Sequence, residues 1–354
     1  MRYFLFFLLF ACLSCGDTDP NADVKDMVLP VKIYRTDSLM YLAAKAFQQP
    51  KPDTMGIFNQ YLKPNRQFWL EMCPLYDKLK ADTSLSDLYI DSVLALSYYG
   101  PFLADKTTGQ LMDSIHQHFS PTFDIASQLV PVFKRWKRDF GVDTIPAICT
   151  FVNGYSPPGM MPEVDQVFPT ISGKYLALGL HYWMGQKFLF YSPDIPVYVK
   201  KRFNPQYMGV VVAQQIAEDL VLPIDLSQNP TLLDKAIRLG IRQCVVDALL
   251  PSTPDSTKMW YTSMQMAYCH KFEKNIFNFV KGELYNKDFL EQRKFTEDKP
   301  FTAELSRESA PRLAQYWGWE VVKSYMKTHP DVKIADLAQR KDYEKIFKES
   351  AYKP

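Results

Sequence analysis

The chain has little net charge and lacks several motifs that mark common functional sites. Its 354 residues include 41 basic and 39 acidic side chains, a net charge of +2, which excludes a strong electrostatic case for nucleic-acid binding. No Gly-x-Ser-x-Gly segment and no glycine-rich phosphate loop is present, so neither a serine hydrolase nor a nucleotide site is indicated. The densest basic stretch, residues 134–138, is expected to be a solvated helix face.

An unbroken apolar run covers only residues 3–10. A helix needs about 20 apolar residues to cross a bilayer, so this run does not predict a transmembrane anchor. It follows Arg2 and ends in small residues, an arrangement typical of a secretory signal. We therefore predict a signal peptide over residues 1–14.

Two cysteines stand where a bacterial lipoprotein receives its lipid. Cys12 follows Leu-Phe-Ala, whereas Cys15 leaves a longer signal and is followed by a polar segment. Because signals usually run to about 15–30 residues, we favour acylation of Cys15, with palmitate among the expected acyl chains and Cys12 as the alternative. An ordinary cleaved signal with incidental cysteines is the other interpretation.

Beyond the signal, the composition is that of a folded body. Hydrophobic residues make up 47% and charged residues 23% of the chain, which is ample for a packed core. We find no repeat and no linker-like stretch after residue 28, so we predict a polar tether over 15–28 and a single domain over 29–354. The remaining cysteines match no zinc spacing and are expected to be buried free thiols: Cys73, Cys149, Cys244 and Cys269.

The hydrophobic pattern predicts an α+β fold dominated by helices, with one small sheet. Strands are expected over 29–34, 145–153, 166–170 and 174–183. Helices are expected over 37–46, 55–62, 84–96, 106–119, 123–140, 205–220, 232–250, 262–285, 310–328, 334–338 and 342–350.

A small sheet followed by an amphipathic helix is the order in which zincin-type metallopeptidases present a His-Glu-x-x-His zinc site. At the corresponding place this chain has Gln214, Gln215 and Glu218. Glutamine binds zinc poorly and cannot act as a general base, so we expect no catalytic zinc and no other cofactor. We expect this helix to be structural, with Gln214 and Glu218 bonded to each other or to water.

Other candidate catalytic groups are weak. The histidines are scattered or placed on different helix faces: His116, His118, His181, His270 and His329. Asp87 and Asp91 lie one helical turn apart, a spacing that suits glycoside chemistry but arises easily by chance. We therefore predict no catalytic residue.

Aromatic and basic residues gather between residues 187 and 203, which makes this segment a candidate partner surface. Its central members are Tyr191, Tyr198, Arg202 and Phe203. Aromatic side chains and arginine are enriched at protein interfaces. The alternative is that these aromatic rings cap the sheet.

Several segments make the chain similar to the gliding-motility-associated lipoprotein B (GldB) family of Bacteroidetes. The segments are residues 175–185 (YLALGLHYWMG), 195–203 (IPVYVKKRF), 232–234 (LLD), 247–255 (DALLPSTPD) and 318–326 (GWEVVKSYM). They occur in one order and span roughly residues 30–340, most densely in the second half.

The resemblance implies a zincin-like fold that lacks the metal ligands. It also implies an envelope lipoprotein, anchored by lipid to the outer membrane rather than the inner one, that works with proteins of the gliding or secretion apparatus. We carry two hypotheses: a non-catalytic scaffold or stabilising partner, which the missing metal motif favours, and an envelope hydrolase acting on peptide or glycan.

Overall fold

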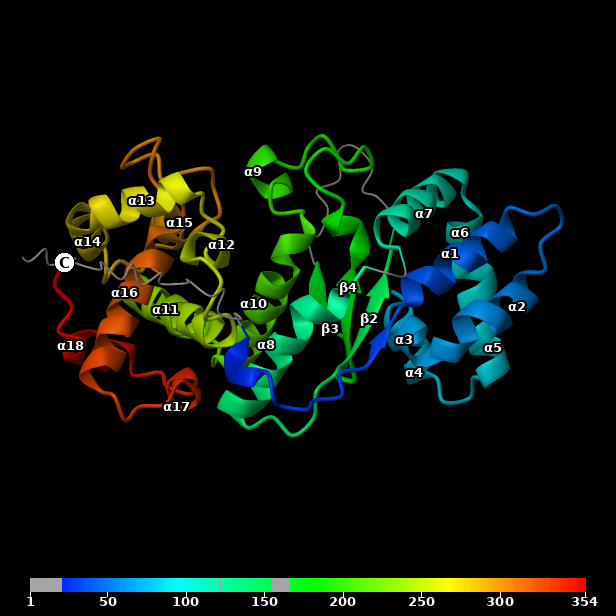
Figure 1. The fold of residues 1–354 in the computed structure, drawn as a ribbon, viewed down its shortest axis with the longest axis horizontal. Coiled ribbons are helices and arrows are strands. Elements are labelled where there is room, and N and C mark those ends of the chain that lie inside the picture. The colour runs from blue at the N-terminus through cyan, green and yellow to red at the C-terminus, as the bar shows by residue number, and fades with distance from the viewer. Residues whose placement is uncertain (1–20, 121–122, 154–165) are drawn as a thin grey trace, which may run out of the picture.

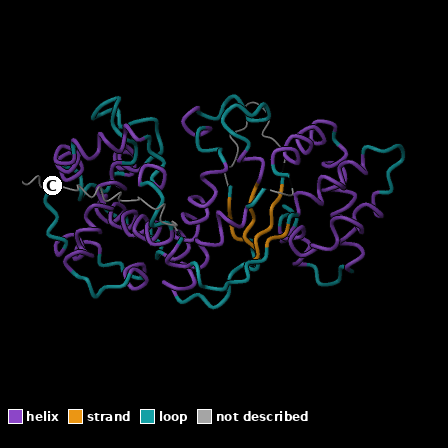
Figure 2. The backbone as a smooth tube through the Cα atoms, viewed as in Figure 1, coloured by secondary structure: helices purple, strands orange, loops and turns teal. Residues whose placement is uncertain are grey.

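The computed structural model describes residues 21–120, 123–153 and 166–354. Its only sheet within these ranges has four strands, β1 (Ile33–Tyr34), β2 (Ala147–Phe151), β3 (Val167–Pro169) and β4 (Tyr175–Gly179). Their order is β1-β2-β4-β3, with β1, β2 and β4 parallel and β3 antiparallel to β4. The strands lie at the centre of a mostly helical molecule (Figure 2), so the α+β prediction is confirmed.

The two faces of the sheet bury different side chains. Leu176 and Leu178 of β4 alternate with Tyr175 and Ala177, as the period-two pattern predicts for a strand covered on both sides. Tyr175 packs edge-on against the ring of Phe68, at 5.9 Å between centroids, on the side of the early helices. Each face therefore belongs to a separate helical layer.

The layer on the Phe68 side consists of the first seven helices, drawn in blue and cyan in Figure 1. They are α1 (Thr36–Phe47), α2 (Thr54–Ile57), α3 (Arg66–Glu71), α4 (Tyr76–Ala81), α5 (Asp87–Ser92), α6 (Gly100–Ala104) and α7 (Lys106–His118). Short π-helical segments, Phe58–Leu62 and Val93–Tyr99, extend α2 and α5. The predicted helices 55–62 and 84–96 are thus present but change their winding.

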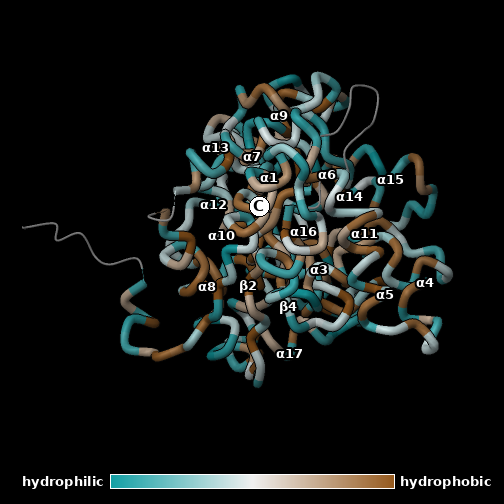
Figure 3. Tube along the Cα trace, turned by 90° about the vertical axis from the view of Figure 1, so that its right-hand side faces the viewer, coloured by the Kyte–Doolittle hydropathy of each residue, from teal (hydrophilic) through white to brown (hydrophobic). Residues whose placement is uncertain are grey.

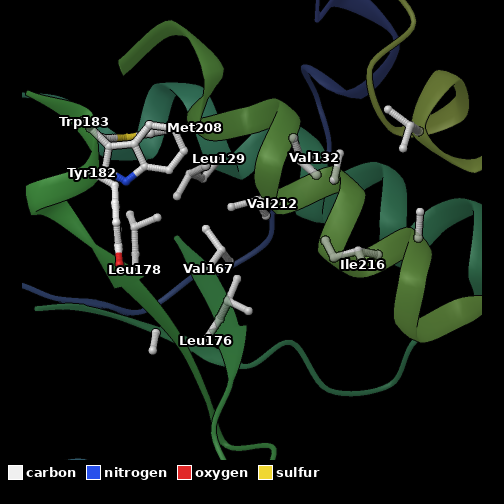
Figure 4. Packing of buried hydrophobic residues seen from close by; sticks show 14 of the residues in the cluster. Leu129, Val132, Val167, Leu176, Leu178, Tyr182, Trp183, Met208, Val212 and Ile216 are labelled. Atoms are coloured by element: carbon white, nitrogen blue, oxygen red, sulfur yellow. The ribbon is translucent and has the colours of Figure 1, made fainter. Parts of the chain in front are cut away.

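The opposite face is covered by α8 (Ile125–Phe140) and α10 (Met208–Leu220). Met208, Val212 and Ile216 of α10 recur every four residues and point at the sheet and α8 (Figure 4). The amphipathic pattern of this helix thus corresponds to its buried face. Fully burying such a side chain contributes about 1.5–3 kcal/mol.

The remaining helices form a layer beyond α8 and α10, on the left in Figure 1. They are α11 (Leu232–Leu249), α12 (Asp255–Lys258), α13 (Ser263–Lys271), α14 (Glu273–Lys281), α15 (Phe289–Thr296), α16 (Leu313–Thr328), α17 (Ile334–Ala338) and α18 (Tyr343–Glu349). A short helix, α9 (Val197–Lys200), lies between the sheet and α10 in the sequence.

Helices α11 and α16 touch backbone to backbone where two glycines meet. A Cβ on Gly318 would lie 1.8 Å from the carbonyl oxygen of Ala236, and one on Gly240 would lie 2.2 Å from that of Gly318. Only glycine allows this approach. The contact joins the two longest helices of the outer layer.

Some predicted boundaries are wrong. Strand 174–183 ends at Gly179, where a 3-10 turn, Leu180–Trp183, begins. Helix 262–285 is two helices, because the backbone leaves the helical region at Phe272 and each half then buries its own apolar residues. Helix 310–328 begins at Leu313, after Pro311 and the left-handed Arg312 (φ 51°). Strand 29–34 is paired only at Ile33–Tyr34.

The folded body begins before residue 29. Residues Ala22–Val24 form a 3-10 turn in which Val24 is buried and Asp23 binds Arg135 and Arg138 of α8, at 2.6 and 2.8 Å. The basic stretch 134–138 is therefore not simply solvated, because Arg135 is only 2% exposed. The predicted signal peptide, Cys12, Cys15 and the start of the tether lie outside the described residues.

Two further expectations concern the cysteines and membrane-spanning helices. All four body cysteines are buried free thiols, as predicted. Burial raises the pKa of Cys149 and of Cys269 to about 12, which keeps both thiols protonated at neutral pH. None of the helices in the described part of the chain is long and apolar enough to cross a bilayer.

Candidate functional site

The three polar residues of the predicted degenerate metal site point in different directions on α10. Gln214 is buried and donates a hydrogen bond from Nε2 to the carbonyl oxygen of Lys258, at 2.8 Å. Gln215 donates to the Asp219 carboxylate on its own helix, at 2.9 Å. Neither amide bonds Glu218, so of the two expected arrangements, a bond between Gln214 and Glu218 or bonds to water, the first is not formed.

Glu218 instead binds two arginines of α11. Its carboxylate lies 2.6 Å from Nη2 of Arg238 and 3.2 Å from Nε of Arg242, and its side chain is 46% exposed. Opposite charges on neighbouring helices thus fasten α10 to α11, with the modest strength expected of a solvated ion pair. All three polar groups have structural partners, which accords with a structural role for this helix.

An ion cluster around a buried lysine lies next to this helix. Nζ of Lys258 is 2.7 Å from Asp247 and 2.8 Å from Asp255, and its side chain is 4% exposed. The indole of Trp319 donates a hydrogen bond to the other oxygen of Asp247, at 2.6 Å. The cluster connects α11, α12 and α16.

The remaining candidate groups do not come together. His116 stacks on Tyr41, with 3.9 Å between ring centroids, while His181 is buried at the end of the sheet. Asp87 and Asp91 both bind Arg66. Their spacing of one helical turn is therefore explained by a shared ion pair. No group of His, Cys, Asp and Glu side chains that could hold a metal ion is found among residues 21–120, 123–153 and 166–354.

The predicted partner surface is divided by the fold. Phe203 is 1% exposed and packs against Tyr182 and Tyr191, so it serves the core and cannot contact a partner. Tyr191 is half-buried, and its hydroxyl accepts a hydrogen bond from the backbone N–H of Met184. Arg202 is mostly buried, but it lines a hollow together with the half-buried Tyr198.

This hollow, here called the aromatic-basic pocket, has a volume of about 710 Å³. It lies between α9 and α13, which both stand on the upper side of the molecule in Figures 1 and 3. Residues 260–262 and the loop 299–311 complete the wall. The aromatic lining consists of Tyr198, Tyr207, Trp260, Tyr261, Tyr268 and Phe272.

Two arginine side chains lie against the ring of Trp260 in the wall of the pocket. The guanidinium carbons of Arg202 and Arg312 lie 4.8 and 5.5 Å from the centroid of the Trp260 ring. Asp298 holds both arginines, with contacts of 2.6 Å to Arg202 and 3.4 Å to Arg312. Trp260 has a left-handed backbone (φ 56°), which is rare for a bulky residue and turns its ring toward the two arginines.

The rim of the pocket carries an excess of positive charge. Five lining residues are cationic and one is acidic: Lys201, Arg202, Lys271, Lys299 and Arg307 against Glu308. Arg202 is paired with Asp298, and Lys299 lies 3.2 Å from Glu297. The other three cations are exposed and form no ion pair with any described acidic side chain.

Most of this pocket was missed by the sequence analysis. Its lining comes from three segments, 198–207, 260–272 and 299–311, that only the tertiary fold brings together. The segment 187–203 contributed Tyr198 and Arg202 because aromatic and basic residues alternate there. Aromatic and basic residues also occur in the other two segments and were the available signal there. They are Trp260, Tyr261 and Lys271 in one segment and Lys299 and Arg307 in the other.

These features define a class: a mostly helical α+β protein with a hollow lined by aromatic and basic side chains. The family model described as gliding motility protein GldB matches residues 17–354. The chain therefore belongs to the GldB family, as the sequence blocks indicated, and the family label, GldB_lipo, points to an envelope lipoprotein. No curated protein and no solved structure matches the chain.

Proposed function

We propose that this protein is a lipid-anchored lipoprotein of the outer membrane that supports gliding motility, or the associated secretion machinery, as a non-catalytic scaffold. Its partner is another protein of that envelope apparatus. Membership of the GldB family supports the gliding role. The apolar run at residues 3–10 and the cysteines that follow it support the lipid anchor.

The aromatic-basic pocket is the observation that carries the scaffold role. Aromatic side chains and arginine dominate the energetics of protein interfaces. Two neutral polar side chains of the pocket are already used in structural bonds. The amide of Gln265 donates to the carbonyl oxygens of Pro300 and Ser309, and the hydroxyl of Thr262 caps α13. The pocket thus offers rings and charges for binding.

The likeness to zincin peptidases without their metal ligands is also part of this proposal. It rests on the family resemblance and on Gln214, Gln215 and Glu218 standing where a zinc motif would stand. If α10 is structural, Glu218→Ala leaves gliding intact in a complemented deletion strain, at a cost of at most about 1 kcal/mol of stability. Loss of gliding with folded, abundant protein would favour the hydrolase hypothesis instead.

Site-specific crosslinking in cells tests the scaffold role. Met264 borders the pocket and is 81% exposed, so a photo-crosslinking side chain in its place is expected to capture an envelope protein. Leu88 is 70% exposed and belongs to α5, which stands far from α13 in Figure 1, so it makes a matched control site. The same adducts at both sites, or none at Met264, would overturn the proposal.

A further inference from the structure

We propose that the aromatic-basic pocket binds an acidic peptide segment that inserts an apolar side chain between its rings. This inference rests on the proposed scaffold function and deepens it by giving the chemistry of the partner. The first support is charge. The whole chain has a net charge of only +2, whereas the pocket rim presents Lys201, Lys271 and Arg307 without acidic partners among the described residues. The local excess is therefore a property of the site.

The second support is the aromatic lining. Trp260 of the pocket wall lies against the guanidinium groups of Arg202 and Arg312, and Asp298 binds both arginines. The hydroxyl of Tyr198 is fixed by the carbonyl oxygen of Asp298 at 3.1 Å, so this wall is ordered before any ligand arrives. Ordered rings bind an apolar side chain with little loss of conformational freedom.

The volume of the pocket and the flexible Met264 side chain at its edge match a short peptide segment. A cavity of about 710 Å³ has room for a few side chains. The exposed Met264 at its edge can adapt to different apolar shapes, because a thioether chain is flexible and polarisable.

The free charged groups of the pocket favour a ligand that carries carboxylates. Both ends of the Gln265 amide are occupied by Thr262, Pro300 and Ser309, whereas the indole N–H of Trp260 has no hydrogen-bond partner among the described residues. The hydroxyl of Tyr261 donates to the carbonyl oxygen of Pro311, at 2.7 Å. Free lysine and arginine side chains remain, and these pair with carboxylates.

Peptide binding to the purified full-length protein in detergent tests this inference. The probe is a fluorescent hexapeptide of alternating glutamate and phenylalanine. It is expected to bind, with an affinity that falls as salt concentration rises, because the rim charges are exposed. Peptides with lysine in place of glutamate, or with serine in place of phenylalanine, are expected to bind at least about tenfold more weakly.

The matched protein variant reverses the three free charges: Lys201→Glu, Lys271→Glu and Arg307→Glu. All three side chains are exposed, so the fold is expected to survive, as a circular dichroism melting curve will show. The affinity for the acidic peptide should drop at least about tenfold, since attraction becomes repulsion. Lys287→Glu, an exposed lysine outside the pocket, is the control and should bind like the wild type.

Unchanged binding by the triple variant, or equal binding of the lysine peptide, would overturn the inference. Binding of oligogalacturonate in place of the peptide would overturn the choice of a peptide ligand. Complementation of a deletion strain by the same triple variant reports separately on the scaffold role. If the wild type binds no peptide but the triple variant abolishes gliding, the scaffold role is retained and the acidic peptide is rejected as the ligand.

Discussion

The imidazole of His181 is buried, and neither ring nitrogen has a hydrogen-bond partner among the residues described. Burial lowers its pKa to about 3, because the charged form would lose its hydration. In the unfolded chain the pKa is about 6.5. Above that pH both states are neutral and stability is unaffected. As pH falls from 6.5 toward 3, only the unfolded state gains the proton, and stability is lost.

Chemical denaturation as a function of pH will show this loss. The free energy of unfolding of the wild type, relative to that of His181→Phe, is expected to fall by about 1.4 kcal/mol for each pH unit below roughly 6. Taking the difference between the two proteins removes the contribution of carboxylates that both share. If the difference in unfolding free energy between the two proteins stayed constant from neutral to acidic pH, the imidazole would take up its proton as readily in the folded state as in the unfolded state.

The pKa of the buried Lys258 shifts in the opposite direction, because two carboxylates lie next to its amine. Burial alone would lower its pKa, but the charges and hydrogen bonds of Asp247 and Asp255 outweigh this effect and raise the pKa above 10.5. A raised folded-state pKa means that the stabilisation is complete below 10.5 and is lost as pH rises through the folded value.

Replacing this lysine removes the cation and leaves Asp247 without its ion pair. Lys258→Met is expected to lower the free energy of unfolding by about 1–3 kcal/mol at neutral pH, because Asp247 is only partly exposed and loses its charged partner. The variant should also lose less stability than the wild type when the pH is raised above about 10.5. Lys274→Met removes an exposed lysine with no ion pair in the described part of the chain, and it serves as the control in the same urea titrations.

At the scale of elements, the crossing of α11 and α16 depends on two glycines. Gly318→Ala would place a methyl group against the carbonyl oxygen of Ala236 in the neighbouring helix backbone, which no side-chain rotation can relieve. We expect a loss of about 1–3 kcal/mol of stability or more, because the helices must move apart. Thermal unfolding followed by circular dichroism measures this loss.

Gly282 provides a control for helix propensity. It has an ordinary φ of −61°, and a Cβ there would come no closer than 3.7 Å to its neighbours. Gly282→Ala should therefore be neutral or stabilise the protein by about 0.4–1 kcal/mol, since the unfolded chain loses freedom. If both alanine variants behaved alike, close packing of α11 on α16 would not explain the glycines.

The elements that were predicted correctly are those with strong local signals. α8 follows Asp124, which caps its first turn, and ends before Gly141, which has a φ of 64°. α11 begins at a capping box formed by Thr231 and Asp234. Such boundaries depend on neighbours in the sequence, so one sequence is enough to find them.

Several predicted bounds and partners are wrong because they depend on contacts distant in the sequence. β1 is reduced to two residues because only Ile33 and Tyr34 reach β2. Glu218 was predicted to bond Gln214 on its own helix or water, but its protein partners are Arg238 and Arg242 of α11, about 20 residues away. The pocket was missed for the same reason, since its wall forms only when Arg202, Trp260 and Asp298 meet.

At the scale of the whole molecule, the start of the folded body limits how far it can stand from a membrane. Asn21 and Asp23 are bound to Arg135 of α8, so the chain is fixed to the body from residue 21 onward. A lipid on Cys15 would leave six peptide units before Asn21, and these reach at most about 20 Å. With the lipid on Cys15, the free tether would be shorter than the predicted span of 15–28, and the α8 side of the protein would lie near the bilayer.

The anchor itself is tested by replacing each cysteine in turn. Cys15→Ser is expected to move the protein from the membrane to the soluble fraction and to abolish incorporation of labelled palmitate, because the apolar run at residues 3–10 is too short to hold it. Cys12→Ser should leave both membrane attachment and labelling unchanged. The reverse result would assign the lipid to Cys12 and lengthen the reach to Asn21 by three residues, or about 10 Å. Attachment and labelling that survive both replacements would reject a lipid anchor at either cysteine.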